Sequence, residues 1–461
     1  MFPKETYIQR RQRLKESIQN GLILLQGNEE SPMNYMDNTY HFRQDSSFLY
    51  FSGLKRAGLN IIIDCESGEE LLFGDNYTID DIVWMGEQIT LDEEADKVKL
   101  KYAGNTDKLS ELLHKSQKKG RTVHYILPYR ADNKLKLMKW LSYTEDHIEK
   151  EHSELLAKAV ISQRIYKSDE EIEEIEKAVN TTVEMHKTAM RITRPGIKES
   201  EIASRVLEIA CATGGNISFP IIATINGQTL HNHYHGNTLH PGQLFLLDCG
   251  AETEMGYAGD LSSTFPVNPV FDPVQREIYE ITLKAHESAI DMLQPGVNFR
   301  DCHIKACTVM AEGMKDMGFL NCNPEEAVER GIHAMFFQCG LGHMMGLDVH
   351  DMENLGEHWV GYNGAERSST FGLKSLRLAR ELEAGFVLTI EPGIYFIPTL
   401  MQKWKKERKF MKELNYDLLW EFRKFGGIRN EENFLITHSG KRLLGQPKPK
   451  TIDDIFELRN L

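Results

Sequence analysis

The first 160 residues alternate short apolar runs with charged stretches. The runs GLILLQG, LNIIIDCESGEELLF and RTVHYILPY are rich in aliphatic residues and end at turn-forming or charged residues, a pattern typical of β-strands. The charged stretches between them are amphipathic, which favours helices. Together these patterns predict a mixed α/β amino-terminal domain over residues 1–160.

A long helix is predicted to open the second domain, residues 161–461. Ser168 stands three residues before Glu171, and this spacing is that of a capping box at the start of a helix. Apolar residues then recur at helical spacing from Ile172 to Val183. The boundary between the domains is therefore expected just before this helix.

Two distant segments of the second domain repeat one pattern. PGQLFLLDCGA at 241–251 and AGFVLTIEPGI at 384–394 each contain a glycine turn, a mostly apolar run, an acid and a second glycine, and matched positions differ by 143. A fainter repeat, RPGIKESEIASRVLEIA and QPGVNFRDCHIKACTVM, leads from a Pro-Gly turn into a helix. The repeats predict two similar halves that face each other. The alternative is two unrelated buried strands that each end in an acid.

The acid of the first copy is Asp248, which follows the apolar run LFLL. A buried carboxylate is costly unless a cation meets it. The chain turns near Glu254 to Gly256, so a hairpin centred near residue 254 would place Asp260 opposite Asp248, with the two Cβ atoms about 5 Å apart. Two opposed carboxylates require a shared proton or a multivalent cation, and we favour the cation.

The acid of the second copy is Glu391, which follows VLTI. The strand expected to pair with it lies beyond a charged insertion at 401–424. In that strand, GGIRNEENFLITHSG, Glu431 stands just before the apolar run and is the expected counterpart of Asp260. Four carboxylates are thus predicted to converge.

A glycine-rich stretch, FFQCGLGHMMGLDVHD, adds His343 and His350, and its backbone can approach a metal or a ligand closely. Two Asp, two Glu and one His hold more negative charge than one divalent ion offsets, so two ions are predicted. These ligands suit Mn²⁺, Fe²⁺, Co²⁺ or Zn²⁺, and paired ions about 3.5–4 Å apart with a shared water favour hydrolysis. Each acid alone is more often a solvated residue, so the prediction depends on the combination.

Composition limits the partners. The chain has 54 Lys and Arg against 68 Asp and Glu, a formal charge of −14, which disfavours nucleic acid and anionic membranes as partners. We find no apolar run near the roughly 20 residues of a membrane span, and the first residues lack the apolar core of a signal peptide, so a cytoplasmic location is expected. The 7 Cys form no CxxC pair and are expected to be free thiols.

Four motifs in this order, DCGAETEMGYAGDLSSTFPV, GLGHMMGLDVHD, LTIEPGIYF and GGIRNEE, resemble those of the prolidase and aminopeptidase P family of dinuclear metallopeptidases. FRQDSSFLYFSGL resembles the amino-terminal domain of aminopeptidase P. The resemblance implies an α/β chain, also described as α+β, with a pseudo-twofold pita-bread catalytic domain. It further implies two divalent metal ions, with Mn²⁺ expected and Co²⁺, Zn²⁺ or Fe²⁺ as alternatives, and a homodimer.

The family's metal ligands carry over to the same five residues, Asp248, Asp260, His343, Glu391 and Glu431. In that family a metal-bridging water attacks the bond before proline. By motif position, Glu391 would be the proton shuttle and His350 the residue that stabilises the tetrahedral intermediate.

A further substrate histidine is implied shortly before the first metal strand, within TLHNHYHGNTLHPG. His231 is the expected residue, because it stands 17 residues before Asp248 as in the aminopeptidase P pattern. His233 and His235 are the alternatives.

Two arginines have implied roles. Arg377 resembles a prolidase arginine that meets the substrate carboxylate, and Arg429 resembles a cation beside the metal ligands. For both, the alternative is an exposed surface charge. Cys339 stands where the HGLGH motif usually begins with His, which puts one substrate contact in doubt, and Asn430 replaces the usual apolar residue of the GxRxE motif.

The expected function is that of an Xaa-Pro aminopeptidase, whose substrates are peptides with proline in the second position. A dipeptide-only prolidase is the close alternative, since loop lengths do not show whether the site is open beyond proline. A metal-free creatinase-type hydrolase and a non-catalytic binding protein of the same fold are further alternatives. Both would be expected to lose metal ligands, and here all five are retained.

Overall fold

A computed structural model describes residues Met1–Asn460 of the protein. The chain forms two compact units. Unit 1 comprises Met1–Arg164 together with the short segment Met352–Gly356, and unit 2 comprises the rest of the described chain. The sequence pattern gives no sign that the chain returns to unit 1 at this segment.

Unit 1 is built on a five-stranded mixed sheet. Its strands are β1 (Leu22–Gln26), β2 (Asn60–Asp64), β3 (Glu70–Phe73), β4 (Lys101–Gly104) and β5 (Val123–Tyr125). They lie in the order β4-β3-β2-β1-β5, with antiparallel pairs at the centre and a parallel pair at each edge. The three predicted apolar runs form β1, β2, β3 and β5. Strand β4 was not predicted, because its sequence KYAG has no apolar run.

Unit 1 also contains eight α-helices and one short 3-10 helix. They are α1 (Lys4–Ile18), α2 (Ser46–Ser52), α3 (Ile79–Met85), α4 (Leu91–Lys97), α5 (Thr106–Lys118), α6 (Ala131–Leu141), α7 (Glu145–Lys150), α8 (Glu154–Arg164) and the 3-10 helix η2 (Glu353–Leu355). Leu109 and Leu113 of α5 join Leu137 and Trp140 of α6 in one buried cluster with residues of the strands. Burial of these apolar faces provides the main stabilisation of the unit.

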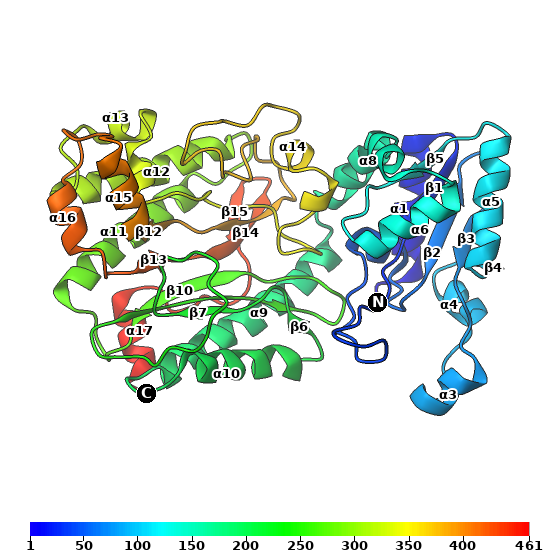
Figure 1. Ribbon diagram of the computed structural model, residues 1–461, viewed down its shortest axis with the longest axis horizontal. Coiled ribbons are helices and arrows are strands. Elements are labelled where there is room, and N and C mark those ends of the chain that lie inside the picture. The colour runs from blue at the N-terminus through cyan, green and yellow to red at the C-terminus, as the bar shows by residue number, and fades with distance from the viewer. Residues whose placement is uncertain (461) are drawn as a thin grey trace. The chain divides into compact units, whose positions relative to one another are not determined.

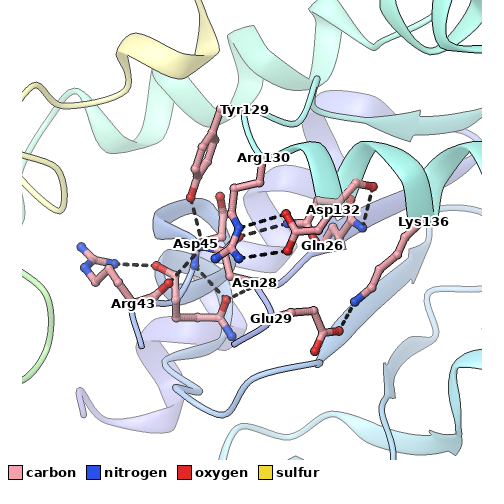
Figure 2. Close-up of polar contacts among 11 residues, drawn as sticks. Gln26, Asn28, Glu29, Arg43, Asp45, Tyr129, Arg130, Asp132 and Lys136 are labelled. Atoms are coloured by element: carbon pink, nitrogen blue, oxygen red, sulfur yellow. Dashed lines mark hydrogen bonds and ion pairs between the residues drawn. The ribbon is translucent and has the colours of Figure 1, made fainter. Parts of the chain in front are cut away.

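Asn28, which follows β1, is the centre of a buried polar network in unit 1 (Figure 2). Its Nδ2 donates to the Arg43 carbonyl and to the Tyr129 hydroxyl, each at 3.0 Å. Its backbone N–H donates to Gln44 at 2.6 Å, and its Oδ1 accepts from Asn133 at 3.0 Å. The network satisfies buried polar groups and ties two connecting segments to the end of β1.

Unit 2 contains two three-stranded antiparallel sheets, β10-β8-β7 and β11-β14-β15, and two small pairs, β12-β13 and β6-β9. Its strands are β6 (Asn216–Ile217), β7 (Ile222–Thr224), β8 (Leu244–Cys249), β9 (Ala251–Glu252), β10 (Leu261–Pro266), β11 (Val387–Ile390), β12 (Gly393–Tyr395), β13 (Gly427–Arg429), β14 (Glu432–Thr437) and β15 (Gly440–Leu443). Each copy of the repeated sequence pattern forms the strand predicted for it, β8 or β11.

Two helix pairs accompany the two sheets. The helices of unit 2 are α9 (Asp169–Ile192), α10 (Glu199–Ala212), α11 (Pro273–Asp291), α12 (Phe299–Asp316), α13 (Pro324–Glu329), η1 (Ile332–Met335), α14 (Glu357–Val360), α15 (Pro398–Lys406), α16 (Tyr416–Glu421) and α17 (Ile452–Arg459). Helix α9 packs on β8 and β10 and α10 on β7, whereas α11 packs on β11 to β13 and α12 on α11 (Figure 1). The predicted capping box at Ser168 and both predicted helices after Pro-Gly turns are confirmed.

The two halves of unit 2 meet edge to edge along β10. The hydroxyl of Thr264 donates to the Arg429 carbonyl at 3.1 Å, and the backbone N–H of Glu431 donates to the Ser262 carbonyl at 3.1 Å. This contact brings the ends of the two predicted acidic strands together.

All 7 cysteines are free thiols, as predicted. Among residues 1–460, no helix combines the length and the apolar character that crossing a bilayer would require.

Candidate active site

A cavity of about 510 Å³ in unit 2 lies where the two halves meet. It is lined by four acids, four histidines, one cysteine, two arginines and a group of apolar and small residues. The acids, histidines, cysteine and arginines are Asp248, Asp260, Glu391, Glu431, His231, His233, His343, His350, Cys339, Arg377 and Arg429. All five predicted metal ligands are therefore brought to one cavity.

The first acidic pair comes from the β8–β10 hairpin. Glu252 bridges to Ala258, so the turn is centred one residue later than predicted, and Ser262 lies opposite Asp248. The predicted position of Asp260 directly across from Asp248 is therefore wrong by two residues. Side chains alternate between the two faces of a sheet with a period of two. Asp260 therefore still lies on the same face as Asp248 and is its diagonal neighbour.

In the second acidic pair, the two residues do lie directly opposite each other. Ile390 pairs with Glu432 on one side and Gly393 pairs with Arg429 on the other, and the same register places Glu391 opposite Glu431. In register, Glu431 thus corresponds to Ser262 of the first hairpin. The predicted correspondence between Glu431 and Asp260 is wrong, although both acids reach the cavity.

His343 is held by a loop that lies against β11. Its backbone N–H donates to the Thr389 hydroxyl at 3.1 Å, and its carbonyl accepts from the Thr389 N–H at 3.0 Å. The preceding residue must be glycine, because a Cβ at Gly342 would lie 2.0 Å from the Thr389 carbonyl oxygen. Nδ1 of His343 lies 3.0 Å from the Met344 carbonyl, which selects the tautomer whose Nε2 lone pair faces the acids.

Nε2 of His343 lies 3.3 Å from Oδ2 of Asp260 and 3.7 Å from Oε1 of Glu391. One ligand atom each of Asp260, His343 and Glu431 lies within 4.8 Å of the other two. Oδ1 of Asp260 and Oε1 of Glu431 are buried without a hydrogen-bond partner. Buried carboxylate oxygens without partners, beside an imidazole lone pair, fit a divalent cation.

The shifted pKa values of the acids in the cavity also indicate a cation site. Burial raises the pKa of Asp260 well above its ordinary value, and the carboxylates of Asp248 and Glu391 raise it further. Burial, followed by repulsion from Asp260, raises the pKa of Glu431 well above its ordinary value. Burial also raises the pKa of Glu391, although His343 opposes this shift. Carboxyl groups in this state retain protons unless cations replace them.

Arg429 is a buried cation at the base of the cavity, so the alternative of an exposed charge does not apply to it. Its guanidinium donates to Oδ2 of Asp248 at 2.5 Å, to the Ser262 hydroxyl at 2.9 Å and to the Tyr395 hydroxyl at 2.9 Å. One positive charge does not neutralise four acids. Bound cations would neutralise the negative charge that remains.

The predicted substrate residues lie on loops around the same cavity. The rings of His350 and His343 have centroids 3.9 Å apart. Burial against the cavity wall lowers the pKa of His231, and the charge of Arg429 lowers it further. Arg377 is half-buried in the lining.

The structure separates the three candidate histidines only in part. His231 and His233 both line the cavity. Nε2 of His235 instead lies 3.0 Å from the Ile221 carbonyl, and His235 is not part of the lining. Cys339 lies at the cavity wall, where burial raises the pKa of its thiol to about 12.

Comparison with known proteins identifies the family. The model of metallopeptidase family M24 matches residues 173–438, which is more than half of the chain, and that of the aminopeptidase P amino-terminal domain matches residues 7–125. The chain is a member of metallopeptidase family M24. This membership confirms the predicted family, the metallopeptidase class and the pita-bread fold.

Relatives of this M24 chain cover nearly its whole length. It is 31% identical to a human Xaa-Pro dipeptidase over 98% of this chain and 93% of that protein. It is 30% identical to an Xaa-Pro aminopeptidase of Haemophilus influenzae over 100% of this chain and 98% of that protein. A solved structure of zinc-substituted Escherichia coli aminopeptidase P with product matches with a TM-score of 0.81 at 26% identity, over 100% of this chain and 98% of that one.

Three supporting groups of the M24 site were not predicted. The Ser262 hydroxyl donates to Glu431 at 2.8 Å, and its position opposite Asp248 would have followed from the correct hairpin register. Tyr395 holds Arg429, and the sequence signal is only a tyrosine in an apolar strand. Lys167 and Asp351 form a buried 2.8 Å ion pair next to His350, joining residues too distant in sequence to be paired by pattern.

Proposed function

We propose that the protein is a metal-dependent Xaa-Pro aminopeptidase, which hydrolyses the bond between an amino-terminal residue and a following proline. The observation that supports this most is the convergence of two Asp, two Glu and one His on one cavity in an M24 chain. The full-length similarity to proteins named for Xaa-Pro substrates supports the substrate class.

Asp248, Asp260, His343, Glu391 and Glu431 are the residues that would hold two divalent ions, with Mn²⁺ as the expected metal. When bound, the ions supply Lewis-acid activation of water at neutral pH. The oxygen-rich donor set with one imidazole suits Mn²⁺, Co²⁺, Fe²⁺ or Zn²⁺.

Glu391 is the proposed proton shuttle. Its side chain is 21% exposed, compared with 7% for Asp260, so it is the more open of these two acids. Burial raises the pKa of Glu391 above its ordinary value, which makes its carboxylate a better proton acceptor. Glu391 would take a proton from the attacking water and deliver it to the proline nitrogen as that nitrogen leaves.

His350 and His231 are proposed to act on the substrate side. His350 lies beside His343, where its ring would donate a hydrogen bond to the oxygen that becomes negative in the tetrahedral intermediate. His231 would contact the peptide from another loop of the lining. An apolar wall of Phe219, Pro220, Ile222, Leu230 and Val349 offers a surface for the proline ring.

A second candidate function is Xaa-Pro dipeptidase activity. Two observations favour it, namely the similarity to the human Xaa-Pro dipeptidase and the position of Arg377 in the cavity lining. An arginine there would form a charge-assisted pair with the free carboxylate that follows proline in a dipeptide.

A substrate panel tests both functions. The protein would be chelated, reloaded with Mn²⁺ and assayed on Xaa-Pro dipeptides, Xaa-Pro-Yaa peptides and matched Xaa-Ala-Yaa controls. We expect cleavage of both proline series and none of the controls. Cleavage of dipeptides alone would replace the aminopeptidase with the dipeptidase, and no metal-dependent cleavage of either series would overturn both proposals.

Three further predictions accompany this function. Metal analysis of the purified protein tests the expected Mn²⁺, sedimentation tests the expected homodimer, and fractionation of the source cells tests the expected cytoplasmic location.

A further inference from the structure

A second group of side chains that could bind a metal lies in unit 2, and none of its members lines the cavity. His303 and Cys307 stand one helical turn apart on α12, and His333 lies on η1. All three are buried, with exposed fractions of 0%, 0% and 3%. One ligand atom of each lies within 4.8 Å of the other two, and none of the three lines the cavity.

One ligand nitrogen of this group, on His333, has no hydrogen-bond partner. Nδ1 of His333 lies 3.5 Å from the Ala327 carbonyl, which leaves the lone pair on Nε2, and that Nε2 is buried without a partner. A buried polar atom without a partner needs a compensating group, and a coordinated cation is one such group.

The spacing of the group fits tetrahedral coordination. Nε2 of His303 lies 3.4 Å from Sγ of Cys307. A tetrahedral Zn²⁺ with ordinary Zn–N and Zn–S bonds holds its nitrogen and sulfur ligands about 3.6 Å apart. The backbone of Gly372 closes the group, because a Cβ there would lie 3.1 Å from Nε2 of His333.

The protonation state of the two histidines also favours a cation of the zinc type, whereas the thiol has to lose its proton when the cation binds. Burial lowers the pKa of His303 to about 3 and that of His333 to about 4, so both imidazoles are neutral and keep a lone pair near neutral pH. Burial raises the pKa of the Cys307 thiol well above its ordinary value. Binding of the cation would form a metal–sulfur bond and release the thiol proton to solvent.

We propose that His303, Cys307 and His333 form a second metal site, which binds one Zn²⁺ through two imidazole nitrogens and one thiolate. This donor set is softer than the oxygen-rich set of the cavity, so the two sites prefer different metals. Three protein ligands leave one coordination position to a non-protein ligand. The ion would fasten α12 to η1, from which the chain continues toward His343.

Metal analysis of the full chain provides the first test. Protein expressed with zinc would be chelated and reloaded with Mn²⁺, and its metals would then be counted by mass spectrometry. We expect wild type to retain about one Zn²⁺ per chain through chelation, because the site is closed. Cys307→Ala and His333→Gln should lose this Zn²⁺, whereas Cys302→Ala, a buried cysteine on the same helix, should keep it.

Cobalt substitution provides a spectroscopic test. Protein expressed in zinc-depleted medium with Co²⁺ would carry Co²⁺ at this site from the start. Its spectrum should show a thiolate-to-metal charge-transfer band in the near ultraviolet, which a site of carboxylates and imidazole does not give. The band should persist in Cys339→Ala, which removes the one cysteine of the cavity lining.

The spectrum of the wild-type protein tests the second metal site even if a variant does not fold. Absence of the band, or equal Zn²⁺ in wild type and both ligand variants, would overturn the site and leave a thiol–imidazole hydrogen bond in its place. Neither result bears on the peptidase proposal, which depends on other residues.

Discussion

The side of the cavity that is proposed to bind metal, here called the metal-facing side, and the side proposed to bind substrate, the substrate-facing side, differ in how they are built. On the metal-facing side, Asp248 and Glu431 belong to buried strand ends whose register is set by cross-strand pairing. On the substrate-facing side, His231 and Arg377 come from loops and are half-buried or exposed. Strand register positions charge rigidly, whereas loops leave room for specificity.

The two sides also differ in their energetic cost. The metal-facing acids repel one another in a buried place, and only cations or protons relieve this repulsion. The substrate-facing residues have no such cost. Changes on the first side should therefore affect both metal and activity, and changes on the second side activity alone.

The largest effect is expected from Asp260→Asn. Loss of this charge removes an anion that two cations would share, so we expect no measurable turnover and a lower metal content. Metal analysis and a peptide assay measure both quantities. The control is Asp291→Asn, an acid with an 85% exposed side chain at the end of α11, which should behave like wild type. Unchanged metal and turnover in Asp260→Asn would refute the dinuclear site.

His350→Ala should lower kcat by roughly 10²-fold or more, because it removes a hydrogen bond that strengthens in the transition state. Metal content should stay near the wild-type value. His240→Ala, an exposed histidine outside the cavity lining, is the matched control. If the metal disappears together with the activity, His350 belongs to the metal-facing side and the comparison fails.

Arg377→Gln tests whether the substrate-facing side recognises a dipeptide carboxylate. A charge-assisted contact contributes about 1.5–3 kcal/mol, so kcat/KM for Xaa-Pro should fall roughly 10- to 150-fold. Xaa-Pro-Yaa peptides should lose far less. Arg380→Gln, whose guanidinium pairs with Glu383 outside the cavity lining, is the control. Equal losses on both substrate series would mean that Arg377 does not contact this carboxylate.

The smallest effect concerns stability and pH. Because the pKa values of Asp260, Glu391 and Glu431 are raised in the folded protein, the metal-free folded state holds more protons than the unfolded state above about pH 4. Its free energy of unfolding should therefore fall as pH rises. The gain in Tm on adding Mn²⁺ should be about 1–3 °C larger at about pH 7 than at about pH 5.

Thermal unfolding of chelated and Mn²⁺-loaded protein measures this difference. Asp260→Asn, which lacks one of the three acids, should show a weaker dependence on pH. A metal-induced gain in Tm that is the same at both pH values would show that the acids do not titrate as a buried group.

The metal-facing side could be predicted from the sequence because apolar runs that end in acids are visible without a structure. The predicted register is wrong, because the hairpin turn is centred one residue later than the pattern predicts. The residue opposite Asp248 is therefore Ser262, two positions after Asp260. The acid still reached the cavity, because a shift of two keeps the face.

Less of the substrate-facing side could be predicted. Which of His231, His233 and His235 faces the cavity depends on how a loop folds, and sequence patterns do not encode this.

Two features elsewhere in the chain could not be predicted either. The strand β4 has no apolar run that would indicate it. His333 stands 26 residues after Cys307, and only the packing of η1 against α12 brings the two together.

The return of Met352–Gly356 to unit 1 has a consequence for dissecting the protein. A single cut after Arg164 would not yield two complete pieces, because five residues of the first piece would remain on the second. Asp351 immediately precedes this segment, and its buried ion pair with Lys167 would have to be preserved in any shortened chain. Anyone who wishes to study either piece alone must graft or replace that short segment, and cannot simply truncate the gene.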